Sequence, residues 1–341
     1  MLPRALAFAL ALGLFALVAP QSVRSADAPL QKMSIQLGSI PGASWSVLYL
    51  AKDEGLFAKE GLDVDVLPGK TSNDAINAVA TGSVTMAVVL TLNQIINYDK
   101  GLKVVAVGSY LGKNAYGVGI ATDGGAKGTL KDLAGKKILV TSAVNEALMR
   151  GAIKHAGGNP DASTYVLVPN PSSLIGTYVG KQADAVESVL PFITVAIGHA
   201  RPTNYVPFSD SGDPEPGYAI VVKPDMLTTQ KPMIAKALRA IYAAYQLALT
   251  DNAKMTAMSI KTIPDATAAS VNIDWNAFKK FGCDPAQNGK SFAAFVPANY
   301  DTAVKFYQSI GALDHPLDPK SLYTNEFAEG PNAVTKMKCP Q

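Results

Sequence analysis

The sequence is poor in the residues that build metal centres. It contains two cysteines and three histidines in 341 residues. His155, His199 and His315 lie far apart, and none has a second metal ligand at helical spacing. A structural zinc site needs four such ligands. We therefore expect no metal centre and no cofactor, and we interpret each histidine as a surface or helix-capping residue.

Catalytic sequence motifs are also missing. The chain has neither the G-x-S-x-G turn of serine hydrolases nor the G-x-G-x-x-G turn of dinucleotide-binding proteins. Gly69-Lys70-Thr71 resembles the end of a nucleotide-binding P-loop, but Val64 stands where that motif needs its first glycine. The sequence therefore gives no support for an enzyme, although a catalytic group assembled only in the fold would not show in it.

Neither sign of charge is in large excess. Lysine and arginine total 30 against 27 acidic residues, a net charge of +3. Without Met1–Ser25, which contains Arg4 and Arg24 and no acidic residue, the balance is 28 against 27, or +1. Because the charges are also scattered, nothing favours nucleic acid or an anionic membrane surface as a partner.

One long apolar run is present, at the N-terminus. Arg4 precedes the apolar stretch Ala5–Ala19, and Val23-Arg24-Ser25 ends in a small residue. This is the pattern of a cleavable secretory signal over residues 1–25. The alternative is a membrane anchor, but the run is shorter than the ~20 residues that a spanning helix needs. The sequence therefore predicts an exported, periplasmic protein.

Export allows the two cysteines, Cys283 and Cys339, to form a disulfide. We predict that they pair and fix the C-terminal tail. Closing that loop would add roughly 4 kcal/mol to the free energy of unfolding on the chain-entropy model, if the geometry allows. Two unpaired thiols are the alternative, which is less common in exported chains.

The rest of the chain alternates strands, polar loops and helices. In the first unit, Ser34–Gly38 alternates as a strand, a small-residue loop follows, and helical spacing begins at Trp45. Leu62–Val66 alternates as the next strand. Ser44 is the expected N-cap of the helix, and free N–H groups at such a helix start attract anions or polar ligand atoms.

This pattern repeats along the chain and predicts an α/β fold with two lobes, each a central, mostly parallel sheet flanked by helices. We place lobe 1 at residues 32–121 and 216–341 and lobe 2 at residues 122–215. The extended segments Val118–Ala121 and Tyr218–Val222 are expected to be the two crossings between lobes.

Polar, mostly uncharged loops recur where strands end and helices begin. They are Ser39–Trp45, Lys70–Asn73, Thr91–Asn93, Thr141–Asn145 and Asn170–Ser173, with Glu187-Ser188 as a sixth. Thr91 and Gln94 also match a capping box. In open α/β sheets, ligands bind outside the carboxyl ends of the strands, so the loops are expected to meet at a cleft between the lobes. Helix capping alone explains any single serine or threonine, whereas the repetition favours a binding site.

The composition of these loops limits the chemical class of ligand that they could bind. Arginine is absent, and Lys70 is the one basic residue among them. Hydroxyl, amide and backbone N–H groups can hold an anion without a full counter-charge, so a sulfonate, carboxylate or neutral heterocycle is favoured over a phosphate. Trp45 and Tyr110 would stack on a planar ligand or simply pack in the core. Glu187 would accept a hydrogen bond from a ligand amine or lie in solvent at a strand end.

Several segments resemble the substrate-binding proteins of ABC importers, in the branch that serves nitrate, sulfonates, taurine and thiamine-type pyrimidines. The resemblance lies in AKDEGLFAKEGLDV from Ala51, GKTS from Gly69, AVATGSVTMA from Ala78, LKDLAGKKI from Leu130 and GKQADAV from Gly180. It covers essentially the whole chain after the signal. Val189-Leu190 departs from it, because relatives often have an aromatic residue there.

The resemblance implies a periplasmic-binding-protein fold of the type II kind. It implies a monomer that takes up a small ligand and delivers it to a membrane permease and its ATPase. The implied ligand contacts, together with Tyr110 as a candidate wall residue, are Ser39, Ser44, Trp45, Thr71, Ser72, Thr91, Asn93, Thr141, Ser142, Asn170, Glu187 and Ser188. Two alternatives stay open: an enzyme of the same fold acting on a pyrimidine or small acid, and a ligand-sensing input protein.

Overall fold

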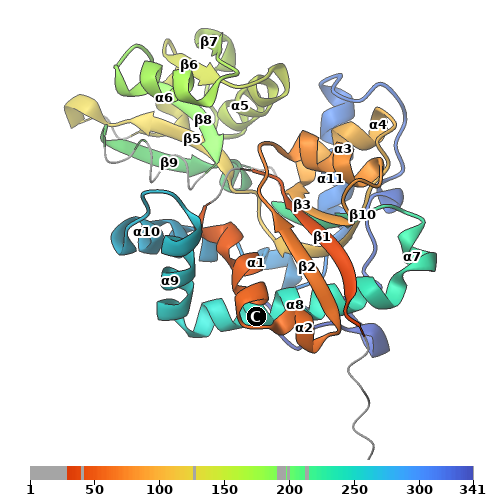
Figure 1. Ribbon diagram of the computed structural model, residues 1–341. Coiled ribbons are helices and arrows are strands. Elements are labelled where there is room, and N and C mark those ends of the chain that lie inside the picture. The colour runs from red at the N-terminus through yellow and green to blue at the C-terminus, as the bar shows by residue number, and fades with distance from the viewer. Residues whose placement is uncertain are drawn as a thin grey trace, which may run out of the picture.

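The computed structural model describes residues 29–39, 42–125, 128–189, 197, 200–211 and 215–340. These residues form two lobes, each with a five-stranded sheet and helices on both faces (Figure 1). The expected signal, residues 1–25, and a helix expected to start at Pro191 lie outside the described residues. Within the described ranges, no helix is long and apolar enough to cross a membrane.

The first lobe contains a sheet in the order β2-β1-β3-β10-β4. β1 pairs in parallel with β2 and β3, and β10 runs antiparallel to β3 and β4. The strands are β1 (Gln31–Leu37), β2 (Leu62–Leu67), β3 (Met86–Leu90), β4 (Val105–Leu111) and β10 (Tyr218–Val222). β3 and β10 are buried throughout, as expected for central strands covered on both faces.

Two groups of helices cover this sheet. Ile35 and Val88 face one of them and Ala87 and Val89 the other, because successive side chains of a strand point to opposite faces. The first group is α1 (Ala43–Asp53), α2 (Leu56–Lys59), α8 (Lys231–Thr250), α9 (Asn252–Thr262) and α10 (Ala268–Lys279). The second is α3 (Ser72–Ala80), α4 (Thr91–Asp99) and α11 (Pro297–Ser309), and the short α7 (Met226–Thr229) precedes α8.

The second lobe repeats the plan with the order β7-β6-β8-β5-β9. Here β5 is the antiparallel strand, paired with β8 and β9. The strands are β5 (Tyr116–Ala121), β6 (Lys137–Val140), β7 (Thr164–Leu167), β8 (Ala185–Val189) and β9 (Thr203–Pro207), and the helices α5 (Ala143–His155) and α6 (Pro171–Val179). α5 packs with Ile138 on one face and α6 with Leu139 on the other.

The chain passes between the sheets earlier than the sequence suggested. Val118–Ala121 and Tyr218–Val222 were expected to be crossings, but they lie inside β5 and β10. The chain instead passes from the first sheet to the second between Leu111 and Tyr116, and it returns to the first sheet between Pro207 and Tyr218. An extended crossing and a strand within a sheet have similar residue patterns, so the sequence could not separate them. The boundary of lobe 1 after Ala121 therefore needs correction, since β5 pairs within the second sheet.

The two crossings are joined to each other. Asn114 Nδ2 donates to Glu215 Oε1 at 3.2 Å, and Tyr307 of α11 donates to Glu215 Oε2. Gly217 lies so close to the first crossing that an added Cβ would stand 2.1 Å from the carbonyl oxygen of Lys113. These contacts define a narrow double connection, the kind of segment about which two lobes can rotate.

The C-terminal region ends against the first lobe. Cys283 and Cys339 form a disulfide with Cα atoms 5.6 Å apart, which confirms the predicted pairing. Cys339 is buried, and Phe292 N donates to Met337 O at 2.9 Å. The tail is therefore fixed both covalently and by backbone hydrogen bonds.

Candidate ligand-binding cleft

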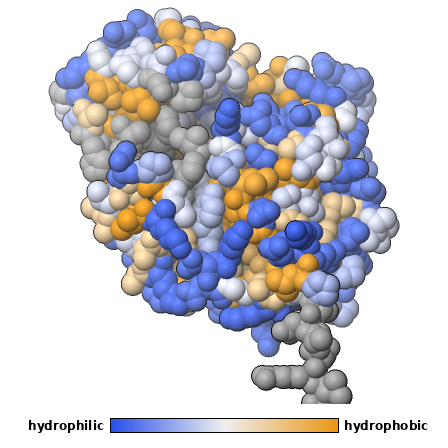
Figure 2. All heavy atoms as spheres, in the orientation of Figure 1, coloured by the Kyte–Doolittle hydropathy of each residue, from blue (hydrophilic) through white to orange (hydrophobic). Residues whose placement is uncertain are grey.

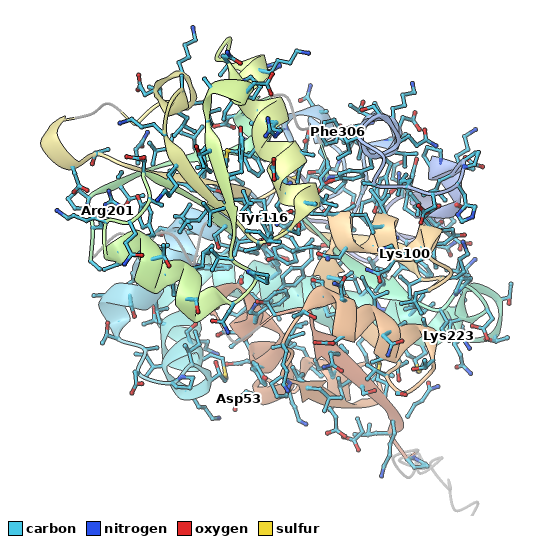
Figure 3. The ribbon with its side chains drawn as sticks, turned by 90° about the horizontal axis from the view of Figure 1, so that it is seen from above. Asp53, Lys100, Tyr116, Arg201, Lys223 and Phe306 are labelled. Atoms are coloured by element: carbon cyan, nitrogen blue, oxygen red, sulfur yellow. A yellow bond between two sulfur atoms is a disulfide. The ribbon has the colours of Figure 1, made fainter. Side chains whose placement is uncertain are left out.

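A cavity of about 510 Å³ lies between the lobes. Its walls are the segments that follow β1, β2 and β3 in the first lobe and β6 and β7 in the second, together with the end of β8. Tyr116 of β5 and Lys100, which follows α4, line it from opposite lobes and are labelled in Figure 3. On the face seen in Figure 2, hydrophilic residues are spread over both lobes.

Six of the residues expected at the cleft line this cavity. They are Ser39, Thr71, Ser72, Asn93, Thr141 and Ser142. Their role as ligand contacts remains a prediction. Two of them also cap helices: Thr71 caps α3 by accepting from Asp74 N at 3.1 Å, and Ser142 caps α5 by accepting from Asn145 N at 3.1 Å.

The first-lobe wall depends on a close backbone approach. Ser72 Oγ donates to Gly38 O at 3.1 Å and accepts from Leu90 N at 3.0 Å. A Cβ on Gly38 would stand 2.4 Å from the carbonyl oxygen of Val88 and 2.8 Å from Ser72 Oγ. Ser72 therefore joins the ends of β1 and β3, and a glycine is needed for them to meet.

An asparagine cluster forms the next part of this wall. Asn73 Oδ1 accepts from Asn93 Nδ2 at 2.9 Å and from Asn97 Nδ2 at 2.7 Å. All three residues line the cavity, as do Lys70 and Lys100. Neither lysine forms an ion pair within the described part of the chain. This wall can therefore offer N–H donors and positive charge to a ligand.

The second-lobe wall is built on a buried carboxyl group. Glu187 Oε2 accepts from Thr141 Oγ1 at 2.9 Å, Thr141 N at 3.3 Å and Asn145 Nδ2 at 3.2 Å. Burial raises the pKa of Glu187 to about 7, while the hydrogen bonds from Thr141 and Asn145 oppose that rise. The alternative that Glu187 lies in solvent is wrong, because its exposed fraction is 0%.

Glu187 lies behind the cavity wall. Thr141 and Asn145, which donate to it, both line the cavity, and so does Val189, two residues further along β8. Its second oxygen, Oε1, is buried and has no hydrogen-bond partner among the described residues. A buried carboxyl oxygen without a donor is costly, and such groups in native structures need an explanation.

The start of α1 differs from the expectation. The helix begins at Ala43 with Gly42 at its N-cap, so the prediction of Ser44 as N-cap is wrong. Asp274 of α10 supplies the missing cap: its Oδ2 accepts from Ala43 N at 2.8 Å. Burial raises the pKa of Asp274 to about 6, and the hydrogen bond from Ala43 opposes that rise. A carboxylate of the chain itself therefore occupies the place where we expected a ligand anion.

The other expected contacts lie elsewhere in the described structure. Trp45 is buried, stacked on Tyr110 with ring centroids 6.0 Å apart and edge-on to Tyr218, which lines the cavity.

Thr91 is the first residue of α4 and lacks the expected capping bond, because Gln94 turns inward and donates to Leu322 O at 2.6 Å. Asn170 caps α6 by accepting from Ser173 N at 3.0 Å. Ser188 is almost fully buried on β8.

Sequence reasoning missed several cavity residues. Tyr218 was read only as part of an extended segment, Tyr116 was not considered, and Asn145, although inside a named loop, was not singled out. Asn97 and Lys100 follow the expected Thr91–Asn93 loop by one or two helical turns, so helical spacing from Asn93 would have indicated Asn97.

The comparisons with known proteins fit this geometry. The profile of the family described as "NMT1/THI5 like" matches residues 43–255, which is more than half of the chain. The chain belongs to the NMT1/THI5-like family. A protein of Brucella abortus named as a binding protein is 23% identical over 294 residues, covering 83% of this chain and 87% of the relative.

Two further comparisons cover different extents of the chain. The formylaminopyrimidine-binding protein of Halalkalibacterium halodurans is 35% identical over 85 residues, which is 25% of this chain and 26% of that relative's length. The crystal structure of the periplasmic aliphatic sulphonate binding protein of Escherichia coli superposes with a TM-score of 0.69 at 14% identity, covering 85% of this chain and 91% of that one. The last comparison establishes the fold.

Proposed function

We propose that this protein is the extracytoplasmic solute-binding component of an ABC importer. It captures a small organic anion or heterocycle between its lobes and delivers it to a membrane permease and its ATPase. The observation that carries the proposal is the 510 Å³ cavity lined from both lobes by the loops at the carboxyl ends of parallel strands. Relatives with binding-protein names support it.

The double connection between the lobes supports a binding cycle by rotation. Asn114 and Glu215 join the crossings, while the cavity walls come from separate sheets, so rotation would change the wall-to-wall distance without breaking either sheet. A ligand that contacts both walls binds the closed form better and shifts the population towards it. The protein then acts by differential binding, without catalysis, and the permease recognises the closed form.

A thermal-shift panel on refolded, ligand-stripped protein tests the proposal. The panel contains taurine, longer alkanesulfonates, nitrate, benzoate, phthalate and thiamine-type pyrimidines. A ligand at 100 times its dissociation constant adds about 2.7 kcal/mol to the free energy of unfolding, which is a clear shift. Folded protein that gives no shift with any compound would contradict this ligand range.

Two neighbouring lysines provide a matched pair of variants for any anionic hit. Lys100 lines the cavity, whereas Lys103 stacks over the ring of Tyr98 at 3.9 Å. Lys100→Ala is expected to reduce the ligand-induced shift, and Lys103→Ala to leave it unchanged. Equal effects of the two variants would place the ligand outside this cavity.

A further inference from the structure

A second cavity, of about 670 Å³, lies in the first lobe beside the disulfide. Its walls come from the C-terminal ends of α8 and α10, the turn that follows α10, and the tail from Met337 to Pro340. Among the described residues, none lines both this cavity and the cleft between the lobes. Cavities of this size are typical of sites for small organic ligands. The proposed function makes no use of it.

The walls of this cavity are fixed by covalent and backbone bonds. The disulfide joins Cys283, in the turn after α10, to Cys339 in the tail. Gly289 N donates to Cys339 O at 3.2 Å, and Phe292 N donates to Met337 O at 2.9 Å. A ligand that enters such a cavity does not have to order its walls, which lowers the cost of binding.

A buried hydroxyl group in the lining has no hydrogen-bond partner among the described residues. It is Oη of Tyr245, on α8, whose side chain is 1% exposed. Burial raises the pKa of Tyr245, so the hydroxyl keeps its proton at neutral pH and can donate. Tyr242, three residues earlier on the same helix, donates to Ser109 O at 2.7 Å. A buried donor without an acceptor is costly, so the cavity side of Tyr245 favours a ligand that brings an acceptor.

A glycine keeps the space beside this hydroxyl open. A Cβ on Gly282 would stand 3.5 Å from Tyr245 Oη and 3.4 Å from the carbonyl oxygen of Lys279. The hydroxyl therefore lies close to the backbone of the turn that carries Lys279 and Lys280. Because Gly282 lines the cavity without a side chain, an acceptor group of a ligand can approach Tyr245 at this turn.

The lining also carries uncompensated positive charge. Lys279, Lys280 and Lys338 line the cavity with exposed side chains, and none of them forms an ion pair in the described part of the chain. The one acidic residue of the described lining is Asp284, and both of its carboxyl oxygens already accept hydrogen bonds from the chain. The acceptor that this cavity favours is therefore an anion.

Apolar side chains form another part of the lining. Phe292 and Met337 contribute to it, and Leu249 at the end of α8 is 40% exposed, which is unusual for a large apolar side chain in this fold. The ring of Phe292 lies 4.6 Å from that of Tyr245, measured between centroids. An apolar ligand body placed here would remove the exposed side of Leu249 from water.

We propose that this cavity is a second ligand site, which takes an apolar carboxylate, a single carboxylate group on an aromatic or hydrocarbon body. The carboxylate accepts from Tyr245 Oη beside the three lysines, and the body packs on the apolar side chains of the lining. The site goes beyond the proposed function and does not depend on it, since the cleft has separate walls.

The methyl group of Met337 can report on this site, because Met337 lines it and no methionine lines the cleft among the described residues. Protein labelled with ¹³C at its methionine methyl groups is titrated by NMR with 4-phenylbutanoate, with 4-phenyl-1-butanol, which lacks the carboxylate, and with butanoate, which lacks the ring. The spectrum of Met337→Leu assigns the signal. We expect 4-phenylbutanoate to shift the Met337 signal saturably and to bind at least fivefold more tightly than either partner. A Met337 signal unmoved by millimolar 4-phenylbutanoate, or equal affinities for the three probes, would overturn the proposal.

Two tyrosines of α8 provide a matched pair of variants. Tyr245→Phe removes the unpartnered hydroxyl and is expected to weaken 4-phenylbutanoate at least threefold, whereas Tyr242→Phe should leave its affinity unchanged. Without ligand, Tyr245→Phe should unfold at no lower temperature than the unaltered protein, since it loses no hydrogen bond, and Tyr242→Phe should unfold at a lower one. Equal affinities in the two variants would contradict the position proposed for the carboxylate.

The lysines test the charge of the site and separate it from the cleft. The triple variant Lys279→Ala, Lys280→Ala, Lys338→Ala is expected to bind 4-phenylbutanoate at least fivefold more weakly, and rising salt should weaken binding to the unaltered protein in the same direction. The double variant Lys70→Ala, Lys100→Ala, which changes only the cleft, should leave the Met337 titration unchanged. Binding lost in the double variant and kept in the triple variant would place the probe in the cleft and overturn the second site, while leaving the proposed function standing.

Discussion

At the scale of single residues, the walls of the cleft depend on two residues in unusual surroundings. Glu187 is a buried carboxyl group whose hydrogen-bond partners among the described residues are uncharged, and Gly38 lies where any side chain would collide with a backbone carbonyl. Both residues shape the cavity through neighbours, Glu187 by orienting Thr141 and Asn145 and Gly38 by admitting Ser72. Substitutions at these positions should therefore affect both stability and binding.

Glu187 makes stability depend on pH. Its pKa is raised from 4.5 to about 7 in the folded protein, so the folded state binds more protons than the unfolded state between these values. The free energy of unfolding should therefore fall as pH rises from about 4.5 to about 7, by about 3 kcal/mol in total. Urea denaturation of Glu187→Gln against the unaltered protein at pH 5 and pH 8 measures this contribution. A variant with an unchanged pH dependence would show that Glu187 is not the group responsible.

Gly38→Ala is expected to destabilise the fold. The new Cβ would overlap the carbonyl oxygen of Val88, and relieving that contact would move β1 away from β3 at a cost of about 1–3 kcal/mol. Gly176→Ala in α6 is the control, because its Cβ meets nothing within 4 Å and alanine is the better helix former. Thermal unfolding should separate the two variants, and equal midpoints would argue against the close approach at Gly38.

At the scale of elements, helix ends in this fold are completed both locally and from a distance. Thr71, Ser142 and Asn170 each cap the helix that they begin, and these ends could be predicted from the sequence. The cap of α1 comes from Asp274, 231 residues further along the chain, so no local pattern could reveal it. Gln94 likewise does not form its expected capping bond, because its side chain donates to Leu322 O in the core. These two residues meet only in the folded protein, so the local sequence does not indicate the contact.

Asp274→Ala should show the importance of the distant cap. Loss of the hydrogen bond to Ala43 N is expected to lower the free energy of unfolding by about 1–2 kcal/mol. Asp225→Ala is the matched control, since Asp225 stands at the N-cap of α7 without a side-chain capping bond. Chemical denaturation of both variants gives the comparison. An Asp274→Ala protein as stable as the Asp225→Ala protein would show that α1 needs no cap from α10.

At the scale of the whole molecule, the fold class and the disulfide follow from the sequence, whereas the path between the lobes does not. Alternating strands, polar loops and helices indicated two α/β lobes, and export with only two cysteines indicated their pairing. The crossings were placed wrongly because β5 and β10 have the pattern of any extended segment. The Thr141–Asn145–Glu187 cluster escaped prediction as a unit because β6, α5 and β8 meet only in the folded lobe.

The disulfide should contribute substantially to the stability of the first lobe. It closes a loop between residues 56 apart, for which the chain-entropy model gives roughly 4 kcal/mol. The double variant Cys283→Ser, Cys339→Ser should lose about that amount in urea denaturation, and adding a reductant should have no further effect on it. A variant as stable as the oxidised protein would mean that backbone contacts alone hold the tail.

The proposed function requires that the two lobes close on a small ligand. Small-angle X-ray scattering of the ligand-stripped protein, with and without a saturating concentration of the probe giving the largest thermal shift, tests it directly. We expect a smaller radius of gyration in the presence of the probe and no change with a non-binding analogue. An unchanged radius of gyration at ligand saturation would contradict closure as the basis of function.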